Sequence, residues 1–126
     1  MSRASAAAAY RRNSVLTASP EKLIKMLYDG AIRNLEISRQ ALCDPARTHS
    51  AEVGECLGKA LSIIGELKTA LDHEQGGEIS ANLQSLYEYS MDQVSEANIS
   101  RSPGPIENSL QVMRTLKEGW DAVIPN

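Results

Sequence analysis

Phenylalanine is absent from this 126-residue chain, and its only aromatic residues are four tyrosines and one tryptophan. A core must therefore be built from Leu, Ile, Val, Ala and Met, which is typical of packed helices rather than of sheets. Cysteine is also scarce, because only Cys43 and Cys56 occur and they lack the paired spacing of a zinc site. We expect both to be buried free thiols in a reducing compartment, not parts of a disulfide framework.

An excess of positive charge is missing as well. Thirteen Lys and Arg against sixteen Asp and Glu give a net charge of −3 and a pI near 5.4. This composition argues against nucleic acid as a partner, since it leaves no cationic excess to neutralise phosphates. No apolar run approaches the roughly 18 residues that span a bilayer, and the Ala-rich opening ends at Arg11 and Arg12 without the features of a signal peptide. We expect a cytoplasmic protein with no membrane insertion.

Motifs that carry enzyme chemistry are lacking too. His49 and His73 lie beside helix breaks, and neither forms the Glu-x-x-His pair of a di-iron bundle. No glycine-rich phosphate loop or dinucleotide fingerprint occurs, and Gly76-Gly77 is better explained as a helix stop. The residues therefore predict no catalytic activity, no metal, no cofactor and no small-molecule substrate.

Breaks divide the chain into a leader and four helical segments. Residues 1–18 are mostly small and polar, which predicts a flexible leader or a short cap helix. Ser19-Pro20-Glu21 is a strong helix start, and Pro105 can open the last helix. The predicted helices span about 20–43, 51–75, 79–100 and 105–124, each roughly 30 Å long. With short connections they predict an all-α fold in which residues 19–126 form an antiparallel four-helix bundle.

The helices carry more apolar surface than one core requires. In the first helix a core stripe (Leu23, Leu27, Ala31, Ser38 and Leu42) has apolar neighbours on both flanks. Its apolar arc exceeds half of the circumference, whereas one buried side needs little more than about 100°. In the third helix we expect Ile79, Leu83, Leu86 and Val94 to face inward. The apolar residues beside these stripes, which are candidates for a partner-binding groove, are Met26, Tyr28, Ile37, Tyr87, Met91, Val112, Leu116 and Val123.

Two explanations of this surplus remain open. A helix that touches two neighbours needs a wide apolar face, or part of the surface is an exposed groove for a partner helix. The leader poses a similar choice, since Tyr10, Val15 and Leu16 are apolar residues in a polar tail. They either staple the start of the first helix or fold back over the groove, where Tyr10 could bury its ring and keep its hydroxyl wet.

Two long stretches resemble the flagellar secretion chaperone family. TASPEKLIKMLYDGAIRNLEISRQAL, from Thr17 to Leu42, resembles the first long helix of that family. LDHEQGGEISANLQSLYEYSMDQVSEAN, from Leu71 to Asn98, resembles its second-to-third helix region. The segment from Ala9 to Val15 is similar to the family's leader, and the stretch ending in Trp120 matches its fourth helix. Ser90 departs from the pattern, because the family has a larger apolar residue there.

The resemblance implies a four-helix bundle without catalytic activity. It also implies a partner, the disordered C-terminal region of newly made flagellin, which such chaperones bind in the cytoplasm. They block premature polymerisation and present the subunit to the flagellar export gate. The alternative from the residues alone is a structural helical adaptor, in which the surplus apolar surface meets a second copy of the chain.

Overall fold

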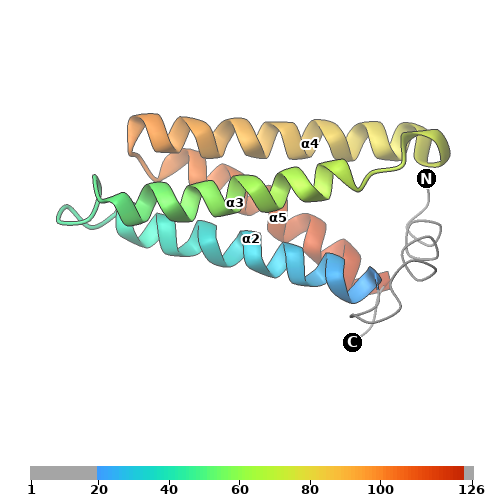
Figure 1. Ribbon diagram of the computed structural model, residues 1–126, viewed down its shortest axis with the longest axis horizontal. Helices are drawn as coiled ribbons and strands as arrows, with labels where there is room; N and C mark the ends of the chain where they lie inside the picture. The colour runs from blue at the N-terminus through green and yellow to red at the C-terminus, as the bar shows by residue number, and fades with distance from the viewer. Residues whose placement is uncertain (1–19, 124–126) are drawn as a thin grey trace.

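The computed structural model describes residues 20–123, with side chains from residue 21 to residue 122. Its four helices are α2 (Pro20–Leu42), α3 (Ala51–Thr69), α4 (His73–Ser100) and α5 (Gly104–Val123). Successive helices run in opposite directions, as the colour gradient in Figure 1 shows. The described residues contain no strand. The predicted all-α, antiparallel four-helix bundle is therefore confirmed, while the leader lies outside the described residues.

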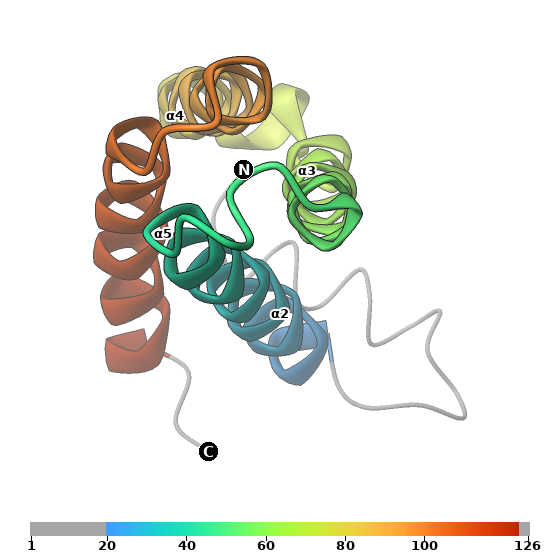
Figure 2. The ribbon, with the colours of Figure 1, turned by 90° about the vertical axis from the view of Figure 1, so that its left-hand side faces the viewer.

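Each helix packs against two neighbours. α2 lies between α3 and α5, and α4 lies between the same two helices on the other side. The bundle consequently has four seams, and the α2–α3 and α4–α5 seams share no helix. In Figure 2, α3 and α4 are seen nearly end-on, whereas α5 is seen from the side. α5 is thus strongly inclined to the other helices, so one of its ends lies farther from α4 than the other.

The connection between α3 and α4 differs from the predicted one. α3 ends at Thr69 instead of near residue 75, and α4 begins at His73 instead of near residue 79. The Asp72 carboxylate caps α4 by accepting hydrogen bonds from the backbone N–H groups of Glu74 and Gln75, at 3.1 and 3.2 Å. The helix break predicted at Gly76-Gly77 is present as a kink inside α4, where Gly77 has the non-helical angles φ 50° and ψ −123°.

The α4–α5 connection is held by hydrogen bonds from Arg101 to the loop between α2 and α3. Arg101 ends α4 in the left-handed conformation, with φ 52° and ψ 42°. Its guanidinium donates to the backbone carbonyls of Thr48 and Ser50, at 3.3 and 2.9 Å. These bonds tie the end of α4 to the loop that precedes α3, which fixes where α5 starts.

The core differs in detail from the predicted stripes. In α2, Ile24 and Leu35 are buried, whereas Leu23, which was expected in the core, is 37% exposed. In α4 the predicted order is reversed, because Tyr87 is buried and Leu86 is exposed. Both cysteines are free thiols, but Cys43 is exposed rather than buried.

Three aromatic side chains meet in the core and join three helices. Trp120 Nε1 on α5 donates to Tyr28 Oη on α2 at 3.1 Å, and Tyr28 Oη lies 2.5 Å from Tyr87 Oη on α4. The ring centroids of Tyr28 lie 6.5 Å from those of Tyr87 and 6.4 Å from those of Trp120. Most buried polar groups in proteins are hydrogen-bonded, and here the two tyrosine hydroxyls form hydrogen bonds across the helices.

Candidate partner-binding surfaces

Charged side chains pair across the α2–α5 seam toward the C-terminal end of α5. Lys117 Nζ lies 3.1 Å from Asp29 Oδ1, and Lys25 Nζ lies 3.2 Å from Asp121 Oδ1. The hydrogen bond with Asp29 is the main cause that raises the pKa of Lys117, and the hydrogen bond with Lys25 is the main cause that lowers the pKa of Asp121. Each charged form is stabilised by its partner on the other helix, so α5 is held to α2 along this side.

The α4–α5 seam has a different character. Asn108 Nδ2 on α5 donates to Gln93 Oε1 on α4 at 2.9 Å, but no ion pair joins these two helices among the described side chains. Residues at helical spacing from Asn108 and Gln93 lie on the same flanks of their helices. They form what we call the α4–α5 surface: Ile79, Leu86 and Tyr89 on α4, which are exposed, and Val112 and Leu116 on α5, which are half-buried.

The core beneath the α4–α5 seam contains small polar side chains. Ser90 on α4 and Ser109 on α5 are fully buried, and their Oγ atoms have no hydrogen-bond partner within the described part of the chain. A buried hydroxyl without a partner costs stability, typically about 1–3 kcal/mol. The α4–α5 side of the core therefore contains buried hydroxyls without a hydrogen-bond partner, whereas the charged groups at the α2–α5 seam are paired.

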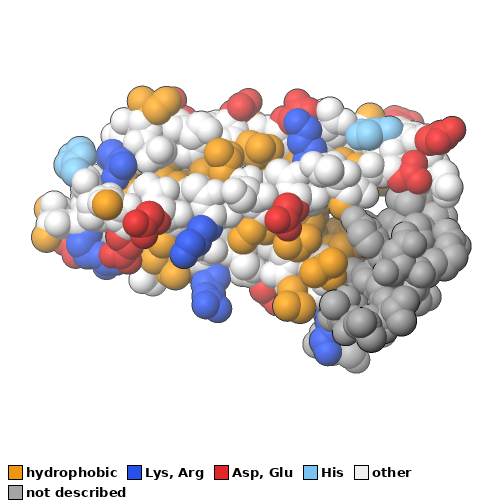
Figure 3. Space-filling model, in the orientation of Figure 1, with side chains coloured by type: hydrophobic (Ala, Val, Ile, Leu, Met, Phe, Trp, Pro, Cys, Tyr) orange, Lys and Arg blue, Asp and Glu red, His pale blue; other side chains and the backbone are white. Residues whose placement is uncertain are grey.

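A second apolar surface lies at the α2–α3 seam, on the opposite side of the bundle. Here the helices approach closely, because a Cβ at Gly30 would lie 3.3 Å from Ile63 Cδ1. Apolar side chains gather along this boundary in Figure 3. The α2–α3 surface comprises the exposed Leu23 and Met26 and the half-buried Ile37 and Ile63. A shallow pocket of about 480 Å³ continues it toward Gly58.

The structure does not bring the predicted groove residues together. Met26 and Ile37 belong to the α2–α3 surface, whereas Val112 and Leu116 belong to the α4–α5 surface. Met91 is half-buried and packs against the core at the α3–α4 seam, where its Cε would lie 3.8 Å from a Cβ at Gly65.

Two of the candidates have to be reassigned. Tyr28 and Tyr87 are 0% and 2% exposed, so as they stand here they belong to the core and line no exposed groove. Their hydroxyls bond to each other and to Trp120, which explains why aromatic residues beside an apolar stripe are buried. Tyr10, Val15 and Leu16, together with the side chain of Val123, lie outside the described residues.

The exposed apolar residues of α4 were not predicted from the sequence as part of a surface. Leu86 was expected in the core, and Tyr89 was not singled out at all. A usable signal was present, because the buried positions Ser80, Tyr87 and Val94 recur at intervals of seven. Counting only apolar residues concealed this stripe, since one of its members is a serine.

No candidate metal site accompanies these surfaces in residues 20–123. The described side chains include no group of three His, Cys, Asp or Glu residues that could hold a metal ion. Within the same range, no helix combines the length and hydropathy that crossing a bilayer requires. What the described structure offers is two apolar surfaces on opposite sides of a bundle.

Comparison with known proteins gives matches over nearly the whole chain. Residues 2–126 match the family described as flagellar protein FliS. The flagellar secretion chaperone FliS of Vibrio cholerae is 36% identical over 121 residues, which cover 93% of this chain and 87% of that protein. The flagellar secretion chaperone FliSB of Pseudomonas aeruginosa is 38% identical over 109 residues, covering 86% and 84%. FliS of Salmonella typhimurium is 37% identical over 114 residues, covering 90% and 82%.

Proposed function

The chain belongs to the family of flagellar protein FliS, and on that premise we propose that it is a cytoplasmic export chaperone for flagellin. This family consists of chaperones and not of enzymes. We propose that the protein binds the disordered C-terminal region of flagellin, prevents premature polymerisation and helps to deliver the subunit to the flagellar export gate. The match over residues 2–126 is the observation that carries this proposal.

The α4–α5 surface is the principal groove in this proposal. An amphipathic helix binds best where apolar side chains flank a seam between two helices. Leu86 and Tyr89 offer exposed apolar area on one side of this seam, and Val112 and Leu116 offer it on the other.

The leader has a separate place in the proposal. α2 begins directly after residues 1–19, and the exposed Leu23 and Met26 lie in its first two turns. We propose that Tyr10, Val15 and Leu16 cover this part of the α2–α3 surface in the free protein and move, or join the site, when flagellin binds. Deleting residues 1–16 should raise the binding of a hydrophobic dye and change the affinity for flagellin. Unchanged dye binding and unchanged affinity would contradict this role of the leader.

Calorimetry with a peptide from the C-terminus of the cognate flagellin tests the main proposal. We expect a 1:1 complex with a favourable enthalpy, an opposing entropy and a negative heat-capacity change, because the peptide folds as it binds. Circular dichroism should show added helix at saturation. A peptide that stays disordered when saturated would contradict the helix-in-groove geometry. Self-association in light scattering, together with no binding of the peptide, would support the alternative of a structural helical adaptor.

Charged substitutions locate the groove. A double variant, Leu86→Lys with Tyr89→Lys, should abolish peptide binding, because it places two cations on the apolar seam. Its melting temperature should stay within a few degrees of the parent, since both side chains are partly exposed. Ile99→Lys is the matched control, because Ile99 is an apolar residue on the same helix that is 80% exposed. Equal binding by the double variant and the control would exclude the α4–α5 surface as the site.

A further inference from the structure

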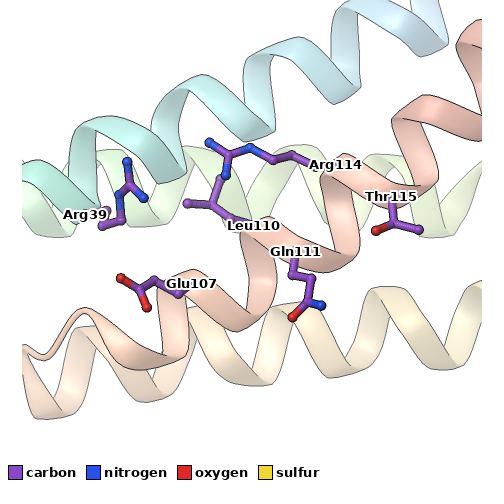
Figure 4. Close-up of a pocket in the computed structure, with 6 residues that line it drawn as sticks. All are labelled: Arg39, Glu107, Leu110, Gln111, Arg114 and Thr115. Carbon is purple, nitrogen blue, oxygen red and sulfur yellow. The ribbon is translucent and has the colours of Figure 1, made fainter.

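A pocket of about 340 Å³ opens at the α2–α5 seam, on the other side of α5 from the α4–α5 surface. Figure 4 shows Arg39 reaching into it from α2 and Arg114 reaching back from α5, with Leu110 between them. Glu107, Gln111 and Thr115 complete the lining. The volume is at the lower end of the range for small-ligand sites, so it suits one terminal residue of a peptide.

The two guanidiniums share a single carboxylate. Arg114 forms an ion pair with Glu36 Oε1, and Arg39 Nη2 lies 3.4 Å from Glu36 Oε2. These contacts engage one nitrogen of each guanidinium, whereas a guanidinium carries five N–H donors. The remaining N–H donors of the two guanidiniums could bind a second carboxylate without displacing Glu36.

The rest of the pocket restricts what kind of carboxylate fits. Leu110 is 1% exposed and presents an apolar wall, so the group attached to the carboxylate should also be apolar. Glu107 also lines the pocket, and its negative charge offsets the net positive charge of Arg39, Arg114 and Glu36. A carboxylate would therefore be held by the remaining guanidinium N–H donors and not by a net charge of the pocket. The site combines a fixed cationic pair with an apolar wall, which suits the end of a peptide chain better than a free inorganic anion.

We propose that this pocket binds the C-terminal carboxylate of the bound partner chain, with the aliphatic part of the terminal residue against Leu110. The inference rests on the proposed function, because a partner held by its C-terminal region brings its chain end to the chaperone. Arg114 and Arg39 would each donate to the carboxylate, while Glu36 keeps the two guanidiniums in position. An aspartate or glutamate side chain has the same chemistry, and the experiment separates the two sources.

The test compares two forms of the same flagellin peptide by calorimetry at low ionic strength, one with a free C-terminal carboxylate and one with a C-terminal amide. We expect the amide to bind about three- to tenfold more weakly, as for the loss of one or two charge-assisted hydrogen bonds near a surface. Arg39→Gln and Arg114→Gln should each bring the ratio of the two affinities toward one. Added salt should reduce the ratio as well.

Two further variants keep the result interpretable. Arg33→Gln removes the same charge from an exposed position of α2 outside the pocket, so it should leave the ratio unchanged. Glu107→Gln should raise the ratio, because it removes a negative charge from the pocket. Melting temperatures of all the variants should stay within a few degrees of the parent, since partly exposed ion pairs contribute little to stability.

The outcomes separate this inference from the proposed function. If neither peptide binds, the proposed function fails. If both peptides bind with equal affinity, the chain-end site is refuted while the chaperone role stands. If the arginine variants weaken both peptides by the same factor, the ligand is a side-chain carboxylate, which also refutes binding of the chain end.

Discussion

Removing the Tyr28 hydroxyl should destabilise the bundle without changing its helix content. Tyr28 Oη accepts a hydrogen bond from Trp120 Nε1 at 3.1 Å and lies 2.5 Å from Tyr87 Oη. All three side chains are at most 7% exposed, so water competes little for these bonds. Tyr28→Phe retains the ring and its packing but removes both hydrogen bonds at once.

The expected loss follows from the number of bonds. A neutral hydrogen bond contributes about 0.5–1.5 kcal/mol net, so two of them give about 1–3 kcal/mol. A domain of this size loses about 3–6 °C in melting temperature per kcal/mol, which predicts a decrease of about 3–18 °C. The decrease should lie toward the upper end, because Trp120 and Tyr87 lose a partner in a buried environment.

Denaturant titration followed by tryptophan fluorescence measures this loss directly, since Trp120 is the only tryptophan. Tyr89→Phe is the matched control, because Tyr89 is 44% exposed whereas Tyr28 is 0% exposed. The control should change stability by less than about 0.5 kcal/mol. Equal stability of the two variants would refute the reasoning. A Tyr28→Phe variant with normal stability and altered peptide affinity would return Tyr28 to the groove.

Three other perturbations give expected outcomes. The hydrogen bond with Lys25 is the main cause of the lowered pKa of Asp121. The ion pair therefore stabilises the fold fully above the ordinary pKa of 3.8, and this stabilisation is lost as the pH falls through the lowered pKa. Asp121→Asn should show a smaller acid-induced decrease in melting temperature than the parent. Gly77→Ala should lower the free energy of unfolding by about 1–2 kcal/mol in denaturant titration, because Gly77 has a φ of 50°. Gly58→Ala should instead raise it by up to about 1 kcal/mol, because the added Cβ meets nothing within 4 Å. Leu116→Arg should abolish peptide binding and also lower the melting temperature by more than the lysine substitutions on α4, since Leu116 is half-buried against the core.

The proline and glycine residues that interrupt helices were sufficient to predict the four helices, except for the boundary between α3 and α4. Pro20 and Pro105 lie in the first turns of α2 and α5, as their fixed φ and missing N–H favour. The glycine pair near residue 77 marks a real interruption, because Gly77 is non-helical, but it interrupts α4 after its first turn instead of separating α3 from α4. The sequence signal for that first turn is Asp72, whose carboxylate accepts hydrogen bonds from two backbone N–H groups.

The site could be predicted only in part, because a helical pattern shows how wide an apolar face is but not which neighbour each flank meets. Met26 and Leu116 both lie beside a core stripe, and only the packing order reveals that they are on opposite sides of the bundle. The burial of Tyr28 depends on Tyr87, which is 59 residues away in sequence. No local spacing encodes that hydrogen bond.

α5 has two unlike flanks, and this asymmetry bears on how a chaperone can release its partner. Its α2 side carries ion pairs and the pocket between Arg39 and Arg114, and its α4 side carries the apolar surface. A segment that uses both sides must therefore pass around α5 instead of lying along one seam. A bound helix of 20 residues would follow a seam for about 30 Å, and an extended connection covers about 3.3 Å per residue. A disordered segment meets both demands, whereas a prefolded helix meets only the first. Because such contacts are divided among separate surfaces, the partner can leave one surface at a time, and each step costs only the contacts of that surface. Under the proposed function, tight retention of the partner and its stepwise release are then compatible within one small bundle.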